Sequence, residues 1–437
     1  MTNKVLIFGS GAREHALAVT YLQSPHVNKV IVAPGNSWMQ ISTEGLEIDP
    51  DCSLKDATSM VRIAEKHRPD LIDVAQDDAL AAGTVDLLTK AGFRVFGPTK
   101  AAARIEWDKA WARQFMKRHG IPSPEFHVFS EKTSAMEFVE REYSQNPSKS
   151  LFIKASGLAA GKGALKATSL EEAKLAIQKM DTFGEAGKTF VIEEGLEGEE
   201  FSFYAISDGI HFLPLISAQD HKRQLDHDLG EQTGGMGVVA PTSVTEDLDK
   251  QIIEDFIAPV IKNMEKEGIP YIGILYFSGI VTSKGMYAIE YNARWGDPEC
   301  QAILPSLETD YFNLVTSCLE GKLDTQSVKF DGKTRICLVG ASFGYPVDYS
   351  IVKGKRLLGL DTLEEDILFF SAGLAEQEGQ PVANGGRLFS LVAAGSNIVE
   401  ARKKVYSAMS SLMIEGNLLH FRTDIGWRDL SRILSPQ

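Results

Sequence analysis

Several classes of protein are excluded by what this 437-residue sequence contains little of. Cysteine is scarce: Cys52, Cys300, Cys318 and Cys337 form no C-x-x-C pair, so the sequence predicts neither a disulfide framework nor a zinc site. Long apolar runs are missing, since none approaches the ~18 residues that cross a bilayer. The N-terminal apolar stretch is short and ends at Gly9, which does not fit a signal peptide. We therefore expect a cytoplasmic protein with no membrane partner.

Positive charge is also in deficit, because 45 Lys and Arg residues are outnumbered by 59 Asp and Glu residues, giving a formal net charge of −14. This balance opposes electrostatic binding to nucleic acid. It does not exclude a small anionic ligand, because glycine loops and a few basic side chains hold phosphate inside acidic proteins. The composition, with 43% hydrophobic and 24% charged residues, is that of an ordinary globular protein. The length predicts about two to four domains and favours an enzyme.

Short apolar strands alternate with helices over the first hundred residues, which predicts a parallel sheet with helices on both faces. The expected strands include residues 4–8, 29–32, 71–75 and 94–96, and the expected helices include 81–91 and 101–119. From about residue 123 the pattern changes to a smaller α+β unit. We therefore expect an α/β and α+β multidomain chain with domains at 1–104, 105–328 and 329–437, and a lid subdomain at about 123–195.

A glycine turn follows the first strand, with the sequence G-S-G-A-R-E at residues 9–14. It resembles a dinucleotide fingerprint, but Glu14 replaces the third glycine and the second strand does not end in an acidic residue. Free N–H groups at the start of the next helix can still hold a phosphate, helped by Arg13. The alternative is a plain tight turn that requires positive φ.

A second glycine-rich segment, K-A-S-G-L-A-A-G-K-G, occupies residues 154–163. It fails the P-loop pattern, because Ser156 replaces the first glycine and Gly163 replaces Ser or Thr. A flexible loop that carries Lys162, preceded by Lys154 on a strand, nevertheless suits a triphosphate. A surface hairpin is the alternative. The acidic stretch at 191–200 can present backbone groups to adenine and a carboxylate to a ribose, although such stretches are usually solvated faces.

Glu290 and Asn292 lie on the same side of a predicted strand, about 7 Å apart. Carboxylate and amide oxygens are the ligands that Mg²⁺ prefers, and Arg294 lies close enough to contact an anionic intermediate. The mixed-charge turn Q-D-H-K-R at 219–223 precedes the glycine loop T-G-G-M-G at 233–237. These two segments indicate either a wall that faces a substrate or a solvated loop.

Together these motifs resemble the working parts of ATP-grasp ligases, and their flanking sequences resemble the phosphoribosylamine–glycine ligase (glycinamide ribonucleotide synthetase) family. The resemblance covers essentially the whole chain. It includes G-x-G-x-R-E-H-A at 9–16, F-G-P-T at 96–99, G-L-A-A-G-K-G at 157–163, R-W-G-D-P-E at 294–299, N-G-G-R at 384–387 and D-I-G-W-R at 424–428. It implies an ATP-grasp fold with an N-terminal parallel-sheet (pre-ATP-grasp) domain and a C-terminal cap domain.

The resemblance also implies the roles of individual residues. ATP is expected to contact Lys109, Lys154, Gly161, Lys162, Gly163, Glu193, Glu194, Leu196 and Glu200. Glu290 and Asn292 are expected to hold Mg²⁺ or Mn²⁺. The expected catalytic residues are Arg294, Asp220 and Lys222, and the expected substrate-binding residues are Gly9, Gly11, Arg13, Asp77, Arg223, Gly235 and Asp297.

The implied reaction has two steps and uses only small molecules: glycine, phosphoribosylamine and ATP. The glycine carboxylate attacks the γ-phosphate of ATP to give glycyl phosphate and ADP. The amine of phosphoribosylamine then attacks the acyl carbon and expels phosphate. The sequence leaves the oligomeric state open.

Several positions depart from the family pattern, mostly on the side expected to bind the sugar phosphate. Residues 75–80 replace G-P-E-x-P-L, with Asp77 as a shorter acid, and Ser156 replaces the aspartate of K-A-D-G. Trp38, Ser306 and Ser371 replace other residues usual in the family. The alternative function is therefore an ATP-grasp paralogue that joins a different amino acid or carboxylate to a different amine. A nucleotide-binding regulator is disfavoured, because a binder has no need of the metal pair together with Arg294.

Overall fold

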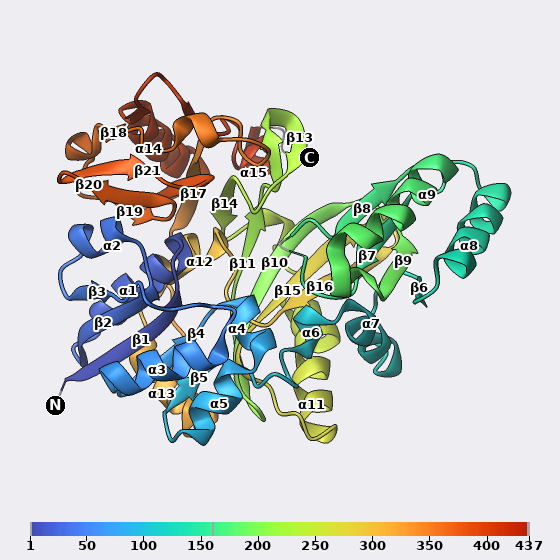
Figure 1. Cartoon of the computed structure of the whole chain (residues 1–437), viewed down its shortest axis with the longest axis horizontal. Coiled ribbons are helices and arrows are strands. Elements are labelled where there is room, and N and C mark those ends of the chain that lie inside the picture. The colour runs from blue at the N-terminus through green and yellow to red at the C-terminus, as the bar shows by residue number, and fades with distance from the viewer. Residues whose placement is uncertain (1, 160, 435–437) are drawn as a thin grey trace.

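Five parallel strands form the first sheet of the computed structural model, which describes residues 2–159 and 161–434 (Figure 1). Their order is β3-β2-β1-β4-β5 and every neighbouring pair is parallel, as predicted. The strands are β1 (Asn3–Gly9), β2 (Val27–Pro34), β3 (Leu46–Ile48), β4 (Leu71–Val74) and β5 (Val95–Phe96). The helices between them are α1 (Ala12–Leu22), α2 (Ser37–Ser42), α3 (Ala57–His67), α4 (Asp77–Ala82) and α5 (Thr84–Lys90).

Both faces of this sheet are buried. On β1, Ile7 joins one hydrophobic core with Leu17 of α1, while Phe8 joins a second core with Met60 of α3. Alternation of this kind follows from the two-residue period of a strand. Because parallel strands end at a common edge, the loops after β1, β2 and β4 meet there, as in other α/β sheets that bind ligands at their carboxyl ends.

Two expected helices are interrupted. The predicted helix 81–91 begins earlier, at Asp77, and breaks at Gly83, whose φ of +81° favours glycine. The predicted helix 101–119 is divided into α6 (Arg104–Trp107) and α7 (Lys109–Arg118) by Asp108, whose extended backbone and carboxylate cap α7 by accepting from Trp111 N at 3.0 Å. Capping therefore overrides the apolar periodicity at that point.

The lid subdomain projects from the rest of the molecule (right of Figure 1) and has a hydrophobic core of its own. Its antiparallel sheet has the order β6-β9-β7-β8. The strands are β6 (Phe126–Phe129), β7 (Leu151–Ala155), β8 (Ala164–Ala167) and β9 (Phe190–Glu194), with helices α8 (Lys132–Gln145) and α9 (Leu170–Lys179). The glycine-rich segment connects β7 to β8, and its Ala160 lies outside the described residues.

A second large sheet runs from the centre of the molecule into the C-terminal segment without a break. Its main path is β16-β15-β10-β11-β14-β17-β22-β19, and the antiparallel pairing of β14 with β17 joins the two parts. The strands are β10 (Glu199–Asp208), β11 (Phe212–Asp220), β14 (Gly237–Ala240), β15 (Ile272–Thr282), β16 (Gly285–Asn292), β17 (Thr334–Ser342), β19 (Ile367–Ser371) and β22 (Arg387–Gly395). Shorter pairs are β12 (Arg223–Leu225) with β13 (Leu229–Gln232), β18 (Leu357–Leu358) with β23 (Met413–Ile414), and β20 (Leu374–Gln377) with β21 (Gln380–Ala383), while β24 (Leu419–His420) pairs with β17.

Helices from the later part of the chain fasten the two large sheets together. Leu314 of α13 shares a core with Leu17 of α1 and Tyr204 of β10, so the N-terminal sheet and the central sheet are not packed independently. The helices of this later part are α10 (Asp249–Ile252), α11 (Ala258–Lys266), α12 (Glu299–Ile303), α13 (Tyr311–Leu319), α14 (Ile398–Ser410) and α15 (Trp427–Leu434), with a π-helical turn at Ile253–Ile257. Of these, α14 packs in the separate core of the C-terminal segment. Across residues 2–159 and 161–434, no helix has the length and apolar character needed to span a bilayer.

Candidate active site

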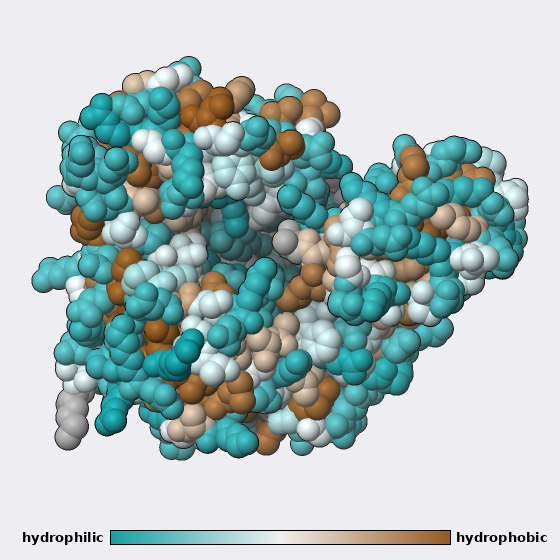
Figure 2. Space-filling model, viewed as in Figure 1, coloured by the Kyte–Doolittle hydropathy of each residue, from teal (hydrophilic) through white to brown (hydrophobic). Residues whose placement is uncertain are grey.

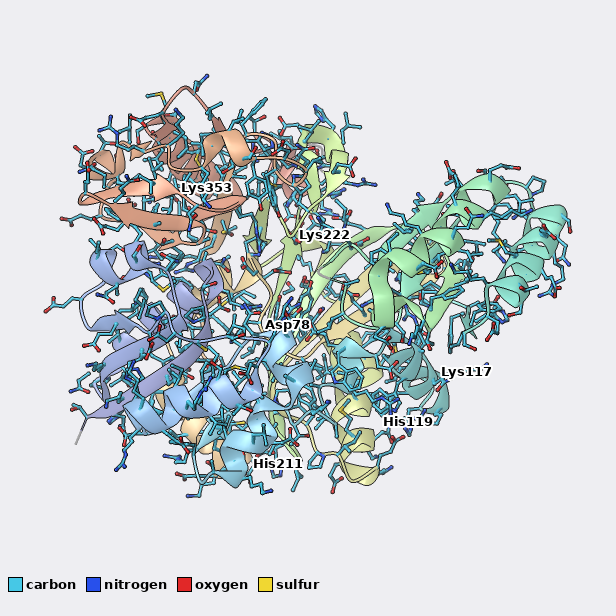
Figure 3. The ribbon with its side chains drawn as sticks, viewed as in Figure 1. Asp78, Lys117, His119, His211, Lys222 and Lys353 are labelled. Atoms are coloured by element: carbon cyan, nitrogen blue, oxygen red, sulfur yellow. The ribbon has the colours of Figure 1, made fainter. Side chains whose placement is uncertain are left out.

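A cavity of about 850 Å³ opens where the lid, the central sheet and the C-terminal segment meet. Figure 2 shows this region as a hollow between the lid and the body, and Figure 3 places Lys222 at its centre. The cavity brings together several residues predicted from the motifs. Those that line it are Gly161, Lys162, Leu196, Glu200, Asp220, Lys222 and Arg223.

Lys154, at the end of β7, is held by a buried ion pair with Glu193 of β9. The other carboxylate oxygen of Glu193 accepts from Arg113 Nε at 2.7 Å. Burial alone would raise the pKa of Glu193, but Arg113 and Lys154 outweigh it and lower the pKa to about 2. The Glu193 side chain thus fixes two cations.

The predicted metal pair, Glu290 and Asn292, lies near Lys109 and Lys154. In the antiparallel pairing of β15 with β16, Ser278 lies opposite Glu290 and Tyr276 opposite Asn292. Because Glu290 and Asn292 are two positions apart on a strand, they share one face of β16. Glu290 Oε2 lies 3.9 Å from Lys109 Nζ. Burial would raise the pKa of Glu290, but the surrounding cations, Lys109 foremost, lower it below its ordinary value and keep the carboxylate ionised.

This pair fits a hard divalent cation that is completed by other oxygens. Asn292 Oδ1 accepts from Arg294 Nη2 at 3.2 Å and keeps a second lone pair. No cluster of three or more His, Cys, Asp or Glu side chains with metal-binding geometry occurs in the part of the chain that the structure describes. A cation held by Glu290 and Asn292 therefore needs phosphate or water oxygens as its remaining ligands.

Arg294 is the most heavily engaged of the predicted catalytic residues. Its Nη2 lies 2.8 Å from Glu106 Oε1, and its Nη1 donates to Trp295 O at 3.1 Å. Its Nε is buried and has no partner among the described protein atoms. Burial lowers the pKa of Arg294, but the carboxylates of Glu106 and Asp77 raise it by more, so the guanidinium stays charged. An orphaned buried donor on a charged group indicates a place for an anionic ligand atom.

Asp220 and Lys222 stand together at the end of β11. Lys222 Nζ lies 3.4 Å from Asp220 Oδ2, whereas the buried Asp220 Oδ1 has no hydrogen-bond partner. Burial raises the pKa of Asp220 to about 7, with Glu299 adding to the effect and Lys222 opposing it. Gly235 (φ +113°) passes directly over this carboxylate, because a Cβ there would lie 2.8 Å from Asp220 Oδ1.

The first glycine turn reaches the same region from the N-terminal sheet. The Gly11 N–H is already used, since it donates to the Glu14 carboxylate at 2.8 Å. Arg13 is buried, pairs with Glu14 at 2.6 Å and donates to Trp295 O at 3.1 Å. When the Gln76 amide is oriented so that its nitrogen donates to Asp77, its oxygen accepts from Arg13 Nη2 at 2.9 Å. The structure thus brings this turn to the 75–80 loop, but the protein itself satisfies much of its binding capacity.

Asp297 connects this turn to the C-terminal segment. Its Oδ2 lies 3.1 Å from Arg387 Nη2, and its Oδ1 accepts from Gln301 Nε2 at 2.8 Å. Arg387 also donates to Gly234 O at 2.9 Å. A Cβ added at Gly11 would lie 3.5 Å from Asp297 Oδ2, so the predicted substrate-binding groups Gly11 and Asp297 are adjacent.

Three side chains at positions that depart from the family pattern, Ser371, Trp38 and Ser306, contact other parts of the protein. Ser371 Oγ donates to Asn36 Oδ1 at 2.8 Å, and its N–H donates to His15 Nδ1 at 2.8 Å, which links the C-terminal segment to the first sheet. Trp38 packs against the C-terminal core. Ser306 Oγ donates to Ile303 O at 2.6 Å within its own turn.

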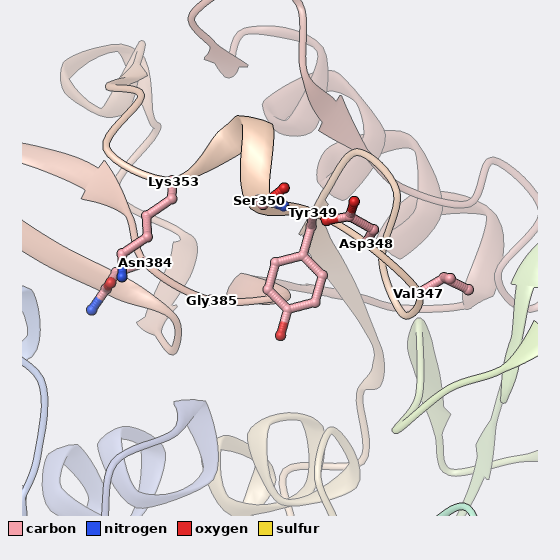
Figure 4. Close-up of a pocket in the computed structure, with 7 residues that line it drawn as sticks. All are labelled: Val347, Asp348, Tyr349, Ser350, Lys353, Asn384 and Gly385. Atoms are coloured by element: carbon pink, nitrogen blue, oxygen red, sulfur yellow. Dashed lines mark hydrogen bonds between the residues drawn. The ribbon is translucent and has the colours of Figure 1, made fainter.

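A smaller cavity of about 360 Å³ lies within the C-terminal segment, apart from all the predicted site residues (Figure 4). Tyr349 points into it, and Lys353 and Asn384 lie on one side. Every residue that lines it, except the half-buried Gly385, is exposed to solvent.

Four charged residues that organise the site are not among the predicted site residues. Arg387 and Glu299 belong to the segments N-G-G-R and R-W-G-D-P-E, which carried a signal for them but indicated no role of their own. Glu106 and Arg113 lie on helices α6 and α7 outside any motif, and only the fold shows that they pair with Arg294 and Glu193.

Comparison with known proteins gives consistent matches along the chain. The matching family models are those for phosphoribosylglycinamide synthetase: its N domain at residues 3–106, its ATP-grasp (A) domain at 107–300 and its C domain at 335–428. A phosphoribosylamine–glycine ligase from Vibrio parahaemolyticus is 39% identical, over 98% of this chain and 99% of that protein. The trifunctional purine biosynthetic protein adenosine-3 of Bos taurus is 38% identical over 100% of this chain, which spans only 43% of that protein's length. The crystal structure of a phosphoribosylamine–glycine ligase from Thermotoga maritima has a TM-score of 0.80 and 31% identity, covering 97% of this chain and 100% of that one.

Proposed function

The chain belongs to the phosphoribosylglycinamide synthetase family, and we propose that it catalyses the ATP-dependent joining of glycine to phosphoribosylamine. The fold is that of an ATP-grasp enzyme with an N-terminal parallel-sheet domain and a C-terminal domain, as the motifs predicted. The observation that carries the proposal is the convergence of Lys109, Lys154, Glu290 and Arg294 around the end of β16. Each of these charges is one that a phosphate-transfer and acyl-transfer site requires.

ATP is proposed to bind between the lid and the central sheet. Lys154 and Lys109 would neutralise the phosphates, and Lys162, with Gly161 and Gly163, would cover them from the loop between β7 and β8. Glu194, Leu196 and Glu200 would contact the adenosine part, whereas Glu193 supports it through its ion pairs. The buried Glu193 holds Lys154 in place, because removing either partner would leave an unpaired buried charge.

Glu290 and Asn292 are proposed to hold Mg²⁺ or Mn²⁺, which when bound would neutralise charge on the phosphate oxygens. The two oxygens lie beside Lys109 and within the field of Lys154, so the site already favours negative ligands. Closure of the lid would exclude water from an acyl phosphate, which water would otherwise hydrolyse.

The second half of the reaction is proposed to take place at Arg294 and Asp220. The free Nε–H of Arg294 would bind an oxygen of the acyl phosphate, whose charge grows as the amine attacks. When the new carbon–nitrogen bond forms, the attacking nitrogen loses a proton, and the unpartnered oxygen of Asp220 would accept it. Lys222 would stabilise the leaving phosphate.

The sugar phosphate is proposed to bind on the side of the first sheet, near Gly9, Gly11, Arg13, Asp77, Gly235 and Asp297. Arg223, which lines the large cavity, completes the proposed substrate-binding residues. We retain the proposed domains at 1–104, 105–328 and 329–437, with the lid at about 123–195. Cytoplasmic location also stays a proposal, in keeping with small charged substrates.

The direct test measures phosphate release from ATP with Mg²⁺, glycine and freshly prepared phosphoribosylamine. Turnover that requires both glycine and phosphoribosylamine is expected. Panels of other amino acids and other amines are the controls. Turnover with a different pair, and none with glycine and phosphoribosylamine, would contradict the proposal and favour the paralogue.

A change in the pH profile is expected for Asp220→Asn. The pKa of Asp220 is raised to about 7, so the proton-accepting carboxylate form increases as the pH rises through that value, and the wild-type rate should rise with it. The amide accepts no proton, so the rate of the acyl-transfer step should fall about a hundredfold and lose that pH dependence. Single-turnover rates between pH 6 and 8 check this, with formation of ADP as an internal control. A variant that keeps the wild-type profile would assign the proton transfer elsewhere.

A further inference from the structure

Ser156 forms a buried link between the lid and the start of α7. Its Oγ donates to Asp108 Oδ1 at 2.8 Å and accepts from the Ala110 N–H at 2.9 Å. Its carbonyl accepts from the Lys109 N–H at 2.9 Å. Three hydrogen bonds therefore join a single lid residue to three successive residues at the beginning of a helix that belongs to the body.

This link lies between two lysines proposed to bind ATP. Lys154 precedes Ser156 by two residues on β7, and Lys109 follows Asp108 directly. On the other side, the Asp108 carboxylate is held by Arg104, whose Nε and Nη2 donate to Oδ2 at 3.0 and 2.8 Å. The Ser156 N–H donates to Thr189 O at 2.9 Å, next to β9. The link is thus rigid at both ends.

The link is more than a helix cap. Asp108 already caps α7 by accepting from Trp111 N, and Ser156 adds acceptors for the N–H groups of Lys109 and Ala110. The additional bonds from Ser156 fix where the end of β7 lies relative to α7. That placement determines the separation of the two ammonium groups on either side of the phosphates.

We propose that Asp108 and Ser156 are positioning residues for ATP, which together hold Lys109 and Lys154 at their working separation. The proposal rests on the proposed function only in taking ATP as the ligand. It requires no contact between Asp108 or Ser156 and ATP.

The test exchanges the two residues and measures the affinity for ATP with Mg²⁺ by titration calorimetry, without glycine or phosphoribosylamine. Ser156→Ala should weaken ATP binding about tenfold, because the link is lost and the Ala110 N–H is left unsatisfied. Ser156→Asp sets two carboxylates against each other and should weaken binding about a hundredfold. The double variant Asp108→Ser with Ser156→Asp restores a hydroxyl–carboxylate bond with the roles reversed, and serine also caps α7, so affinity should return to within about threefold of wild type.

The matched control is Ser169→Ala, which removes the cap of α9 in the same subdomain, where Ser169 Oγ accepts from Glu172 N at 3.2 Å. It should lower the melting temperature about as much as Ser156→Ala does and leave ATP affinity unchanged. The proposal is overturned if Ser156→Ala binds ATP like wild type, or if the exchanged variant binds no better than Ser156→Asp. If Ser156→Asp does not fold, the comparison of Ser156→Ala with Ser169→Ala decides. Failure of glycine ligation alone would refute the proposed function and leave this result intact.

Discussion

Replacing Arg294 with alanine is expected to lower kcat about a thousandfold, because the guanidinium is the charged donor placed to bind the reacting acyl phosphate. The same change should destabilise the protein by about 3–5 kcal/mol, since it leaves the Glu106 carboxylate buried without its partner. Burial already raises the pKa of Glu106 above its ordinary value, so its charge depends on Arg294. Steady-state phosphate release and thermal unfolding measure the two effects.

A second substitution separates structure from catalysis. In the double variant Arg294→Ala with Glu106→Gln, the buried group is neutral and much of the stability should return, whereas the activity should not. Glu106→Gln alone is the matched control and should keep substantial activity. Recovery of activity in the double variant would show that Arg294 acts only by neutralising Glu106.

Replacing Glu290 with alanine is expected to lower kcat about a thousandfold with little loss of stability. The substitution leaves Asn292 as the single protein ligand of the proposed metal pair. It also removes the carboxylate that balances the charge of Lys109 beside the phosphates. Because the Glu290 side chain is 38% exposed and its nearest cation, Lys109, is 28% exposed, removing the carboxylate leaves no fully buried charge without a partner. The dependence of phosphate release on Mg²⁺ concentration is the measurement.

The kcat of Glu290→Gln should lie between those of wild type and Glu290→Ala, since one amide oxygen replaces a carboxylate. Glu185→Ala removes an equally negative side chain that is 87% exposed on the lid, and it should behave like wild type. If Glu290→Ala is saturated at the same Mg²⁺ concentration as wild type and its kcat is unchanged, Glu290 is not a metal ligand.

Local motifs predicted most of the fold, because each carries its own physical reason. The apolar strands at 4–8 and 71–75 are buried on both faces, and a glycine turn after such a strand is visible in the sequence without any long-range information. Glu290 and Asn292 share a face because a strand has a two-residue period, which is also local. The helix break at Asp108 was missed, although aspartate is a preferred N-cap, because the apolar pattern continues through it.

Pairings across the fold could not be predicted in the same way. Arg113 and Glu193 are 80 residues apart, and Arg294 and Glu106 are separated by still more, so no spacing in the sequence connects them. Glu193 illustrates the consequence, since nothing in the acidic motif indicates that its side chain is buried between Arg113 and Lys154. The role of Ser156 is of the same kind, because its partner Asp108 lies 48 residues earlier in the chain, outside the lid subdomain.

The continuous sheet has a consequence for how the chain is made on the ribosome. When the central strands have emerged, β14 is an edge strand whose outer N–H and C=O groups have no partner until β17, which begins only at Thr334, has been synthesised. Bare edges of this kind invite pairing with other nascent chains, and the C-terminal segment therefore serves as the cover that ends this vulnerable interval. A protein truncated after the central strands would keep that edge permanently open and should collect as aggregates instead of surviving as a smaller enzyme.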